Sequence, residues 1–490
     1  MAERRDGTLY YNSRSQNFDN AQPTPSRIQG WRTIAESDDQ GVTWKNVKKE
    51  NALYDAPCQG FLHVLPDRGG QKPVWIFTHP AGPHRQNLVA RISYDDGKTW
   101  PGFRRLHSHS SEYSSLTTMP NGKLGCLFEI WDHERRTHVI RFTQFPKEWL
   151  LEDPVADQLP KVQLKQVRKV EGVGEDHNAF TDLVRFKGKI YLAFRKSEIG
   201  HGVYPDSQII IRSSEDEGMT WLDVYRFSIP DRDTRDPHFL IFKEKLFVYT
   251  GTWDARPLLK NQFQLNDHVG YAVATIDGKT WTPPRLLEGT HGHYIWRAAT
   301  NEKQAYLCAR RVKDYVRTTT RAQRAHLTEQ VLLTSEEGWV WKHHAMVQPD
   351  YGNETAYRIE EDGTLWGVAR TGYGPAQLIR SSPPYQRFQR MALDRPMGGP
   401  MLAKWNDLYI TGGRNTLYGK RVCALYWLAE DRLHPILELP SGGDCSYPGF
   451  VQLDENRALI SYYSSHEGYP RKPGREPPSS IFVAELELEK

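Results

Sequence analysis

The sequence of 490 residues contains no long apolar run, no closely spaced cysteine pair and no large excess of one charge. Because no apolar segment reaches the roughly 18 residues of a membrane-spanning helix, we predict no membrane span. The five cysteines are far apart and form no CxxC pair, which argues against a zinc knuckle and a thioredoxin-like site. We therefore expect free, buried thiols.

The charges nearly balance, with 64 Lys and Arg against 60 Asp and Glu and a net charge of +4. The basic residues are scattered, so a nucleic-acid partner is not predicted. A small anionic ligand needs only a few local arginines and stays possible. The first residues lack the apolar segment of a secretory signal. We expect a secreted or periplasmic protein if an upstream segment is missing, and a cytoplasmic one otherwise.

Sustained helical periodicity is also scarce, and a short repeat takes its place. The pattern S-x-D-x-G-x-T-W occurs at 37–44, 93–100 and 214–221, with weaker copies at 275–281 and 334–341. A glycine turn with an acidic side chain suits a hairpin loop, and the tryptophan can pack beneath it. The acidic residues of the three intact copies are interpreted as structural turn residues: Asp39, Asp95 and Asp216.

The repeat resembles the Asp box of sialidases and other β-propellers. Short alternating strands such as "GKIYLAFR" and "RALISYY" lie between the copies, and the last three copies are 60 residues apart, which suits one four-stranded blade per period. The resemblance implies an all-β fold. We predict a complete six-bladed sialidase-like β-propeller over 177–490, a connector at 157–176 and about three further sialidase-type blades in 1–156.

Residues 1–156 resemble the C-terminal half of a bacterial sialidase. The segment "GTLYYNSRSQ" matches the strand that ends in the family's second substrate arginine, which implies this role for Arg14. The segment "THPAGPHRQNLVARISYDDGKTW" implies Arg85 as the third arginine. The segment "EYSSLTTMPNGKLGCLFEI" implies Tyr113 as the nucleophile and Glu129 as the glutamate that orients the family's first arginine.

The counterpart of the family's first half is absent upstream of this segment. We therefore expect the N-terminal half-site to be incompetent alone, and the chain to be the C-terminal part of a longer protein or to have lost its beginning. Three blades cannot close a ring, and open sheet edges favour association. A homo-oligomer formed through the incomplete N-terminal propeller is one expected consequence.

The second part of the chain, 170–490, resembles a divergent sialidase-like propeller and repeats the same spacing. A glutamate stands nine residues before Gly363 and an arginine seven residues after it, as in the family, and a tyrosine follows two blades later. The resemblance implies that Glu354 activates a nucleophilic Tyr447. It implies the substrate arginines Arg370 and Arg421, and Arg414, in the same blade as Arg421, is a further candidate for substrate binding.

The chemistry explains these residue types. Arginines bind a sugar carboxylate through charge-assisted, often bidentate hydrogen bonds. A carboxylate nucleophile would be repelled by that group, so the sialidases use a neutral tyrosine. The family's arginine–isoleucine–proline motif is replaced near "DHNAFTDLVRF" by His177, and Arg195 ends a nearby strand; both are candidate substrate-binding residues. The general acid stays open between Asp182, Asp236 and His201.

The sequence thus favours a retaining exo-glycosidase that acts on sialic acid or a related sugar acid. A polysaccharide lyase acting on uronates stays open, with His177 or His238 and Tyr447 moving the protons. A non-catalytic carbohydrate-binding propeller is the third possibility. No cofactor is expected, and the pairs His107–His109 and His291–His293 lack the further ligands that a zinc site needs.

Overall fold

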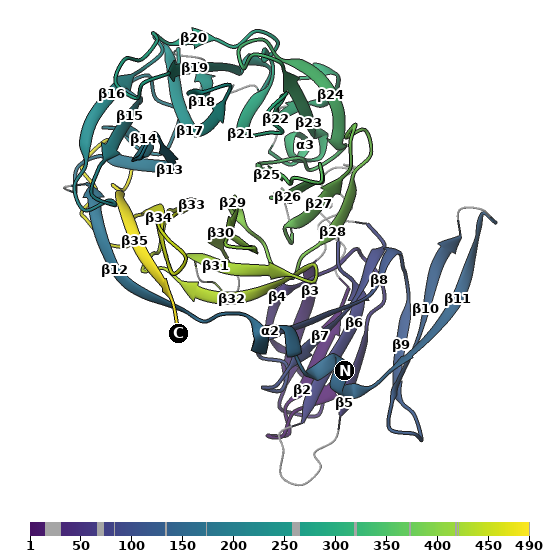
Figure 1. Cartoon of the computed structure of the whole chain (residues 1–490). Coiled ribbons are helices and arrows are strands. Elements are labelled where there is room, and N and C mark those ends of the chain that lie inside the picture. Colours follow the sequence, from purple (N-terminus) through teal and green to yellow (C-terminus); the bar gives the residue numbers. More distant parts are fainter. Residues whose placement is uncertain are drawn as a thin grey trace. The chain divides into compact units, whose positions relative to one another are not determined.

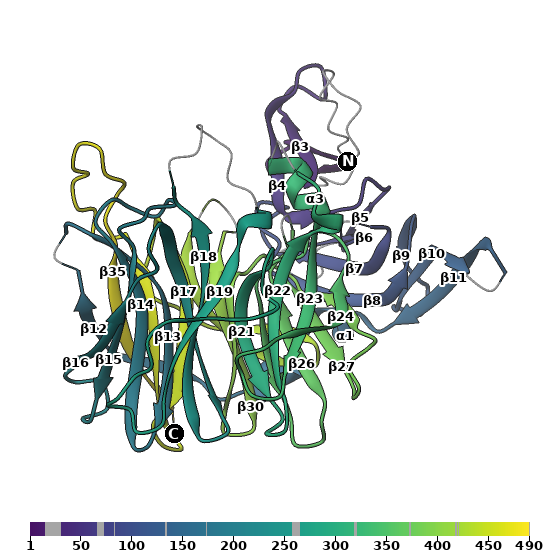
Figure 2. The same cartoon turned by 90° about the horizontal axis from the view of Figure 1, so that it is seen from above.

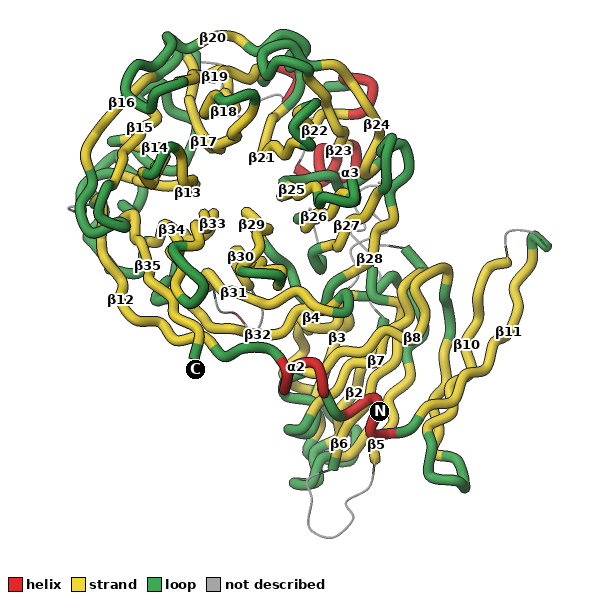
Figure 3. Tube along the Cα trace, in the orientation of Figure 1, coloured by secondary structure: helices red, strands yellow, loops and turns green. Residues whose placement is uncertain are grey.

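The computed structural model describes residues 1–14, 31–65, 73–82, 84–132, 135–172, 174–256, 265–317, 321–371, 374–416, 419 and 421–489. These residues form two compact units. The N-terminal unit comprises Met1–Gln158 with Tyr373–Pro375, and the C-terminal unit comprises Leu159–Gly372 and Ala376–Lys490. Strands dominate both units (Figure 3).

The C-terminal unit is a ring of six four-stranded antiparallel sheets, which we number blades 1 to 6. Blades 1 to 3 consist of β13 (His177–Phe186), β14 (Lys189–Ser197), β15 (Gln208–Ser214), β16 (Leu222–Phe227), β17 (Arg232–Phe242), β18 (Lys245–Asp254), β19 (Val269–Thr275), β20 (Arg285–Leu286), β21 (Tyr294–Thr300), β22 (Ala305–Val312), β23 (Thr328–Ser335) and β24 (Lys342–Gln348). Blades 4 to 6 consist of β25 (Thr355–Ile359), β26 (Leu365–Ala369), β27 (Gln377–Ser381), β28 (Gln389–Ala392), β29 (Gly398–Trp405), β30 (Leu408–Asn415), β31 (Val422–Ala429), β32 (Arg432–Glu438), β33 (Cys445–Gln452), β34 (Arg457–Ser464), β35 (Ser480–Leu488) and β12 (Val162–Glu171).

The first strand of each blade lies innermost. Figure 1 shows β13, β17, β21, β25, β29 and β33 around the centre of the ring, and Figure 2 shows the blades from the side. The short helices of this unit lie in its loops: η1 (Leu265–Asp267), η2 (Lys313–Tyr315) and α3 (Arg321–Leu327).

Blade 6 joins the two ends of this unit. Its outermost strand is β12, which pairs antiparallel with β35 from Val162 opposite Leu488 to Glu171 opposite Ile481. The segment 157–176, which the sequence predicted to be a connector, therefore contributes a strand to the propeller. The prediction missed it because β12 carries many charged residues, as suits an outer strand that is exposed on one side.

The N-terminal unit contains two four-stranded sheets and one three-stranded sheet. Its strands are β1 (Ala2–Glu3), β2 (Leu9–Ser13), β3 (Trp31–Ser37), β4 (Lys45–Tyr54), β5 (Phe61–Leu65), β6 (Val74–Pro80), β7 (Gln86–Ser93), β8 (Gly102–Ser110), β9 (Ser114–Thr118), β10 (Leu124–Asp132) and β11 (Thr137–Phe145). They are followed by the helices α1 (Lys147–Leu151) and α2 (Pro154–Gln158). The expected all-β fold, a six-bladed propeller preceded by about three further blades, is confirmed.

The burial of each strand follows its place in the blade. In blade 1, the second strand β14 is buried almost throughout, whereas the outer strand β16 is mostly exposed. A second strand packs against neighbouring blades through both faces, so it consists of nearly continuous apolar residues rather than an alternating pattern. No helix among the described residues is long and apolar enough to cross a membrane.

The Asp boxes form the hairpins between the third and fourth strands. In the β15–β16 hairpin, Asp216 Oδ1 accepts hydrogen bonds from Ser214 Oγ at 2.8 Å and from Thr220 N at 2.9 Å, and Oδ2 accepts from Thr220 Oγ1 at 2.6 Å. Gly218 N donates to Ser214 Oγ at 2.8 Å. Hydrogen bonds from Thr220 and Ser214 lower the pKa of Asp216 to about 2. Asp39 and Asp95 form the same bonds in their own hairpins.

We predict that Asp216→Ala lowers the melting temperature by a few degrees without a matching change in any activity, and that Asp39→Ala and Asp95→Ala behave alike. The reason is that the carboxylate satisfies the polar groups of its own turn at the edge of the blade. Glu215→Ala is the control, because its exposed ion pair with Lys189 should contribute little. Loss of activity without a change in melting temperature would contradict this prediction.

Candidate functional site

Five blades carry a β-bulge at the same place in the innermost strand. In each, two residues of the inner strand lie opposite one residue of its partner, as between Ser446 and Gly449 of β33. Four bulge residues have a left-handed backbone: Phe180, Asp236, Gly399 and Tyr447, with φ of 61°, 55°, 58° and 56°. Bulges redirect side chains and are frequent next to active sites. Here they gather side chains around Tyr447.

Side chains from two other blades, 1 and 3, enclose Tyr447. The rings of Phe180 and Trp296 each lie 4.8 Å from the Tyr447 ring, centroid to centroid. Thr181 Oγ1 donates to the Tyr447 carbonyl at 2.7 Å, and Arg297 Nη2 donates to the next carbonyl, that of Pro448, at 2.7 Å. The tyrosine is therefore only 6% exposed and its strained backbone is held on both sides.

The hydroxyl of Tyr447 donates to Glu354 Oε1 at 3.0 Å. The other oxygen, Oε2, accepts from Arg370 Nη1 at 2.9 Å and from Gly399 N at 3.1 Å. Burial alone would raise the pKa of Glu354, but the guanidinium groups of Arg370 and Arg310 outweigh it and lower the pKa to about 2. The structure thus pairs a neutral phenol with an ionised carboxylate.

Three arginines lie close to this pair. Arg370 follows β26, Arg414 lies on β30 and Arg235 lies on β17, and each interacts electrostatically with Tyr447. Burial, reinforced by the negative charge of Glu354, raises the pKa of Tyr447 well above its usual value. An anionic group would be attracted by the three guanidinium groups in this largely desolvated setting.

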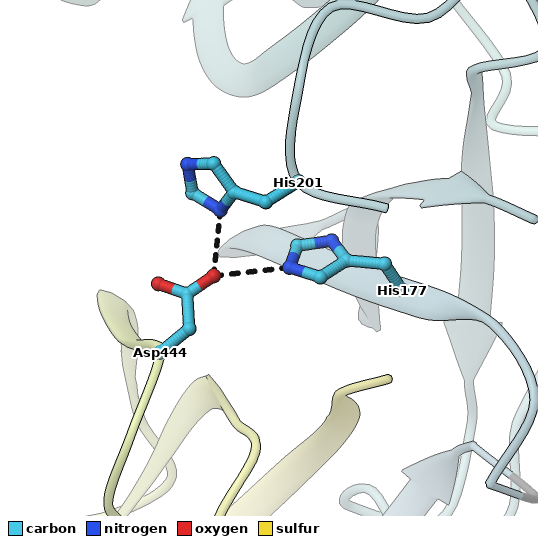
Figure 4. Close-up of side chains that lie close together, drawn as sticks. All are labelled: His177, His201 and Asp444. Carbon is cyan, nitrogen blue, oxygen red and sulfur yellow. Dashed lines mark hydrogen bonds and ion pairs between the residues drawn. The ribbon is translucent and has the colours of Figure 1, made fainter. Parts of the chain in front are cut away.

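A second carboxylate, Asp444, forms an ion pair with Arg414. Figure 4 shows Asp444 beside His177 and His201. Its Oδ2 is 3.0 Å from His177 Nε2 and 2.6 Å from His201 Nδ1. Its Oδ1 accepts from Tyr463 Oη at 2.9 Å and from Arg414 Nη1 at 3.4 Å. Burial would raise the pKa of Asp444, but the hydrogen bonds of the two histidines outweigh it and lower the pKa well below its usual value.

His177, His201 and Asp444 offer donor atoms within 4.8 Å of one another, close enough to be considered as metal ligands. The hydrogen bonds to Asp444 account for the same geometry. In addition, His177 Nδ1 is buried without a hydrogen-bond partner among the described residues, whereas a metal-bound histidine normally donates through its second nitrogen. The neighbouring Arg414 disfavours a cation as well. We interpret this group as a hydrogen-bonded cluster.

Two candidate residues have structural positions that the sequence did not predict. Arg195 is fully buried, with 0% exposure, and pairs with Asp233 at 2.8 Å, so it is not available to a ligand. Asp182 accepts from Arg297 Nη1 at 2.7 Å and from the Phe239 N–H at 2.9 Å. Burial would raise the pKa of Asp182, but Arg297 outweighs it and lowers the pKa, which is the wrong direction for a general acid.

The remaining acid candidates differ in exposure. Asp236 is 3% exposed and its Oδ1 has no hydrogen-bond partner among the described residues. Burial raises its pKa to about 7 against the opposing attraction of Arg235. His201, by contrast, has a side chain that is 45% exposed. Arg421 is exposed immediately before β31, and Arg414 rather than Arg421 lies beside Asp444.

The N-terminal counterparts are assembled differently. Tyr113 is 40% exposed, and its ring lies under the guanidinium of Arg85 at 5.6 Å. Arg85 forms an ion pair with Glu112, which the sequence did not single out. Glu129 meets Tyr113 only through the backbone, from its N–H to the Tyr113 carbonyl at 3.0 Å, and Arg14 is exposed. Among the described residues of the N-terminal unit, this group has no counterpart of the buried tyrosine–glutamate pair.

Five further residues interact with the candidate site residues although no site role was expected for them: Arg235, Arg297, Arg310, Asp444 and Tyr463. A signal for some of them was present. Asp236 and Tyr447 both precede a proline in the bulge of an innermost strand. Arg235 stands directly before Asp236, so this shared pattern indicates that Arg235 lies at the bulge as well. Asp444 and Tyr463 meet only because the ends of β33 and β34 pair, which spacing alone does not show.

The similarity to known proteins agrees with the fold. No protein-family model matches the chain. Over 153 residues the chain is 29% identical to a protein named Sialidase from Micromonospora viridifaciens, and the match covers 30% of this chain and 21% of that protein. The chain thus spans about a fifth of the length of this curated relative.

Among solved structures, a protein of unknown function from Dyadobacter fermentans has a TM-score of 0.55 and 22% identity, and the match covers 68% of this chain and 100% of that chain. At this identity the likeness shows the fold alone. A Hadza microbial sialidase has a TM-score of 0.49 and 14% identity over 75% of this chain and 73% of that chain, which is too distant to bear on function. The chain thus contains a six-bladed β-propeller, and part of its sequence is similar to that of a sialidase.

The raised pKa of Asp236 predicts a specific pH dependence of stability. Since burial favours the protonated carboxyl, wild-type stability should fall as the pH rises from about 4 to about 7, by on the order of 3–4 kcal/mol. Asp236→Asn should remove this loss, because asparagine is neutral and tolerates the left-handed backbone. The measurement is the melting-temperature difference between variant and wild type across this pH range. Asp407→Asn, at an exposed turn, is the control. If the melting-temperature difference from wild type is independent of pH for both variants, the raised pKa of Asp236 is contradicted.

Proposed function

We propose that the C-terminal unit is a sialidase-like exo-glycosidase that hydrolyses a terminal anionic sugar with Tyr447 as the nucleophile. The observation that carries this proposal is the buried hydrogen bond from Tyr447 Oη to Glu354 Oε1 at 3.0 Å, with Arg370 Nη1 on the other carboxylate oxygen at 2.9 Å. A tyrosine with an ionised glutamate partner is an activated nucleophile.

The arginines provide the reason for a sugar acid as substrate. Arg235, Arg370 and Arg414 come from three blades, and each interacts electrostatically with Tyr447. A carboxylate next to the anomeric carbon would bind these guanidinium groups and would repel a carboxylate nucleophile. The sequence had suggested Arg370 and Arg414 as substrate arginines. In this proposal Arg235 takes the role that was expected of Arg195. Arg421, also expected, is not among the three arginines.

The first chemical step follows from the geometry. Tyr447 Oη attacks the anomeric carbon as the bond from that carbon to the glycosidic oxygen breaks, and the leaving oxygen takes up a proton and departs as an alcohol. The tyrosine proton passes to Glu354 Oε1. The phenol is neutral before the attack, since burial and Glu354 raise its pKa. The N–H of Gly399 and the guanidinium of Arg370 keep the carboxylate in place for the transfer. The printed name of the curated relative, Sialidase, is consistent with this reaction class.

Tyr447→Phe and Glu354→Gln should each lower hydrolysis of a panel of sialosides and related sugar-acid glycosides by at least about a hundredfold. Tyr462→Phe is the matched control, because Tyr462 is a buried tyrosine of the same blade whose hydroxyl donates to the Pro440 carbonyl. Unchanged activity of Tyr447→Phe, with purified wild type active, would contradict the nucleophile assignment.

A uronate lyase is the second candidate. The observation that favours it is a half-exposed histidine, His201, in the same unit as Tyr447 and the arginines. His177 and His238, which the sequence suggested for this chemistry, are both buried, and burial lowers the pKa of each to about 4. A lyase product contains a C=C bond that absorbs ultraviolet light and a hydrolase product does not, so product absorbance distinguishes the two candidates. A carbohydrate-binding protein would bind glycans and change none of them.

Arg370→Lys should weaken binding of free sialic acid by on the order of tenfold, although the charge is kept. Lysine cannot engage both carboxylate oxygens while also holding Glu354. Calorimetric titration measures the affinity, and Arg226→Lys, at an exposed outer strand, is the control. Equal affinity of wild type and Arg370→Lys would remove Arg370 from the binding site.

A further inference from the structure

The loop between β14 and β15 is held rigidly around one histidine. Arg195 Nη1 donates to the Gly200 carbonyl at 2.9 Å, Arg235 Nη2 to the His201 carbonyl at 2.6 Å and Arg195 Nη2 to the Gly202 carbonyl at 3.1 Å. Both arginines also pair with the buried Asp233. Two guanidinium groups thus fix three successive carbonyls of this loop. The backbone that carries the half-exposed His201 side chain is therefore held in place.

The ring of His201 is oriented as well. Its Nδ1 lies 2.6 Å from Asp444 Oδ2, and Asp444 is fixed in turn by Tyr463 Oη at 2.9 Å and by His177 Nε2 at 3.0 Å. Figure 4 shows the other ring nitrogen of His201 directed away from Asp444. That nitrogen, Nε2, has no hydrogen bond to a described residue. A carboxylate that holds one imidazole nitrogen leaves the other free to move a proton.

His201 also lies at a suitable place relative to the nucleophile. The ring of Phe180 contacts both residues, with centroids 5.3 Å from His201 and 4.8 Å from Tyr447. The leaving group of an exo-glycosidase extends toward solvent, so its general acid has to be accessible. His201 meets this requirement, whereas Asp236 is almost fully buried and Asp182 is engaged by Arg297.

We propose that His201 is the general acid and base of the glycosidase, with Asp444 as its orienting partner and Arg195 and Arg235 as the residues that position its loop. This proposal rests on the proposed function of the same site. In the first step, imidazolium Nε2–H protonates the glycosidic oxygen as its bond to the anomeric carbon breaks, and the Tyr447 Oη–carbon bond forms while the tyrosine proton passes to Glu354.

The second step restores the enzyme. Neutral His201 takes a proton from water at Nε2, and the water oxygen forms a bond to the anomeric carbon. The bond from that carbon to Tyr447 Oη breaks, and Glu354 returns the proton to the tyrosine oxygen. The net reaction adds one water across the glycosidic bond and needs no cofactor. Asp444 stays ionised in both steps and stabilises the imidazolium.

The test compares two substrates of the full-length protein. One is a sialyl disaccharide, whose leaving alcohol needs protonation, and the other is an aryl sialoside with an acidic phenol, which does not. His201→Gln should lower disaccharide hydrolysis by about 10²–10⁴-fold. With the aryl sialoside the variant should release a burst of phenol equal to the enzyme concentration and then turn over slowly. Azide should restore turnover by His201→Gln, because azide attacks the anomeric carbon without losing a proton and so needs no general base.

The controls separate this proposal from the proposed function. Glu198→Gln, on the same loop and exposed, should behave as wild type, and Tyr447→Phe should abolish the burst with the aryl sialoside. If His201→Gln cleaves the disaccharide as well as wild type does, the assignment of His201 is overturned and the role of Tyr447 stands. If Tyr447→Phe keeps the burst and the activity of wild type, or if wild type hydrolyses neither substrate, both the proposed function and the role of His201 fail.

Asp444→Asn and a chelator test the role of the carboxylate. The variant should lose disaccharide activity more than aryl sialoside activity, because the imidazolium loses its stabilising charge while the loop stays held by Arg195. Equal loss of activity on both substrates would indicate that Asp444 has a merely structural role, and would overturn its assignment as the orienting partner of His201. Loss of wild-type activity on chelation, restored by zinc, would overturn the proton-transfer role in favour of a metal site.

Discussion

The candidate site depends on the neutralisation of one buried negative charge, the carboxylate of Glu354. An isolated carboxylate in a protein interior is very costly, so it has to be neutralised and hydrogen-bonded. Here the partners come from three blades: Arg370 after β26, Gly399 on β29 and Tyr447 on β33. A Cβ added at Gly399 would lie 2.6 Å from the Tyr447 ring, so only glycine allows this approach.

A second buried network supports the other side of the site. Asp233 pairs with Arg195 and Arg235, and these two arginines hold the loop of His201. Asp444 connects His201 with His177 and Tyr463. Removing one partner of such a network leaves a buried charge uncompensated, so these residues should be costly to replace even where they touch no substrate. The positions of His201 and Tyr447 are linked through Phe180 rather than through a direct bond.

The two related tyrosines illustrate how the same local unit can have different surroundings. Tyr113 and Tyr447 each stand nine residues before the turn of a strand pair. Tyr447 sits in a bulge whose carbonyls are held by Thr181 and Arg297 from other blades of a closed ring. Tyr113 lacks these partners and stays 40% exposed beside Arg85. The difference comes from the neighbouring blades and from the bulge of β33, which β9 does not have.

The sequence by itself determined the strands, the Asp-box turns and the six-bladed ring, because these depend on local alternation and on turn residues that repeat at a fixed period. It also singled out Glu354, Arg370 and Tyr447 by spacing. Only the tertiary structure decided which arginines face that tyrosine: Arg195 became buried against Asp233, while Arg235 took its place near the site. The partners of Asp444 and the closure of blade 6 by β12 were equally invisible in the sequence, since they join residues up to 326 positions apart, from Val162 to Leu488. Such pairings depend on how whole blades pack around the ring, which no local pattern encodes.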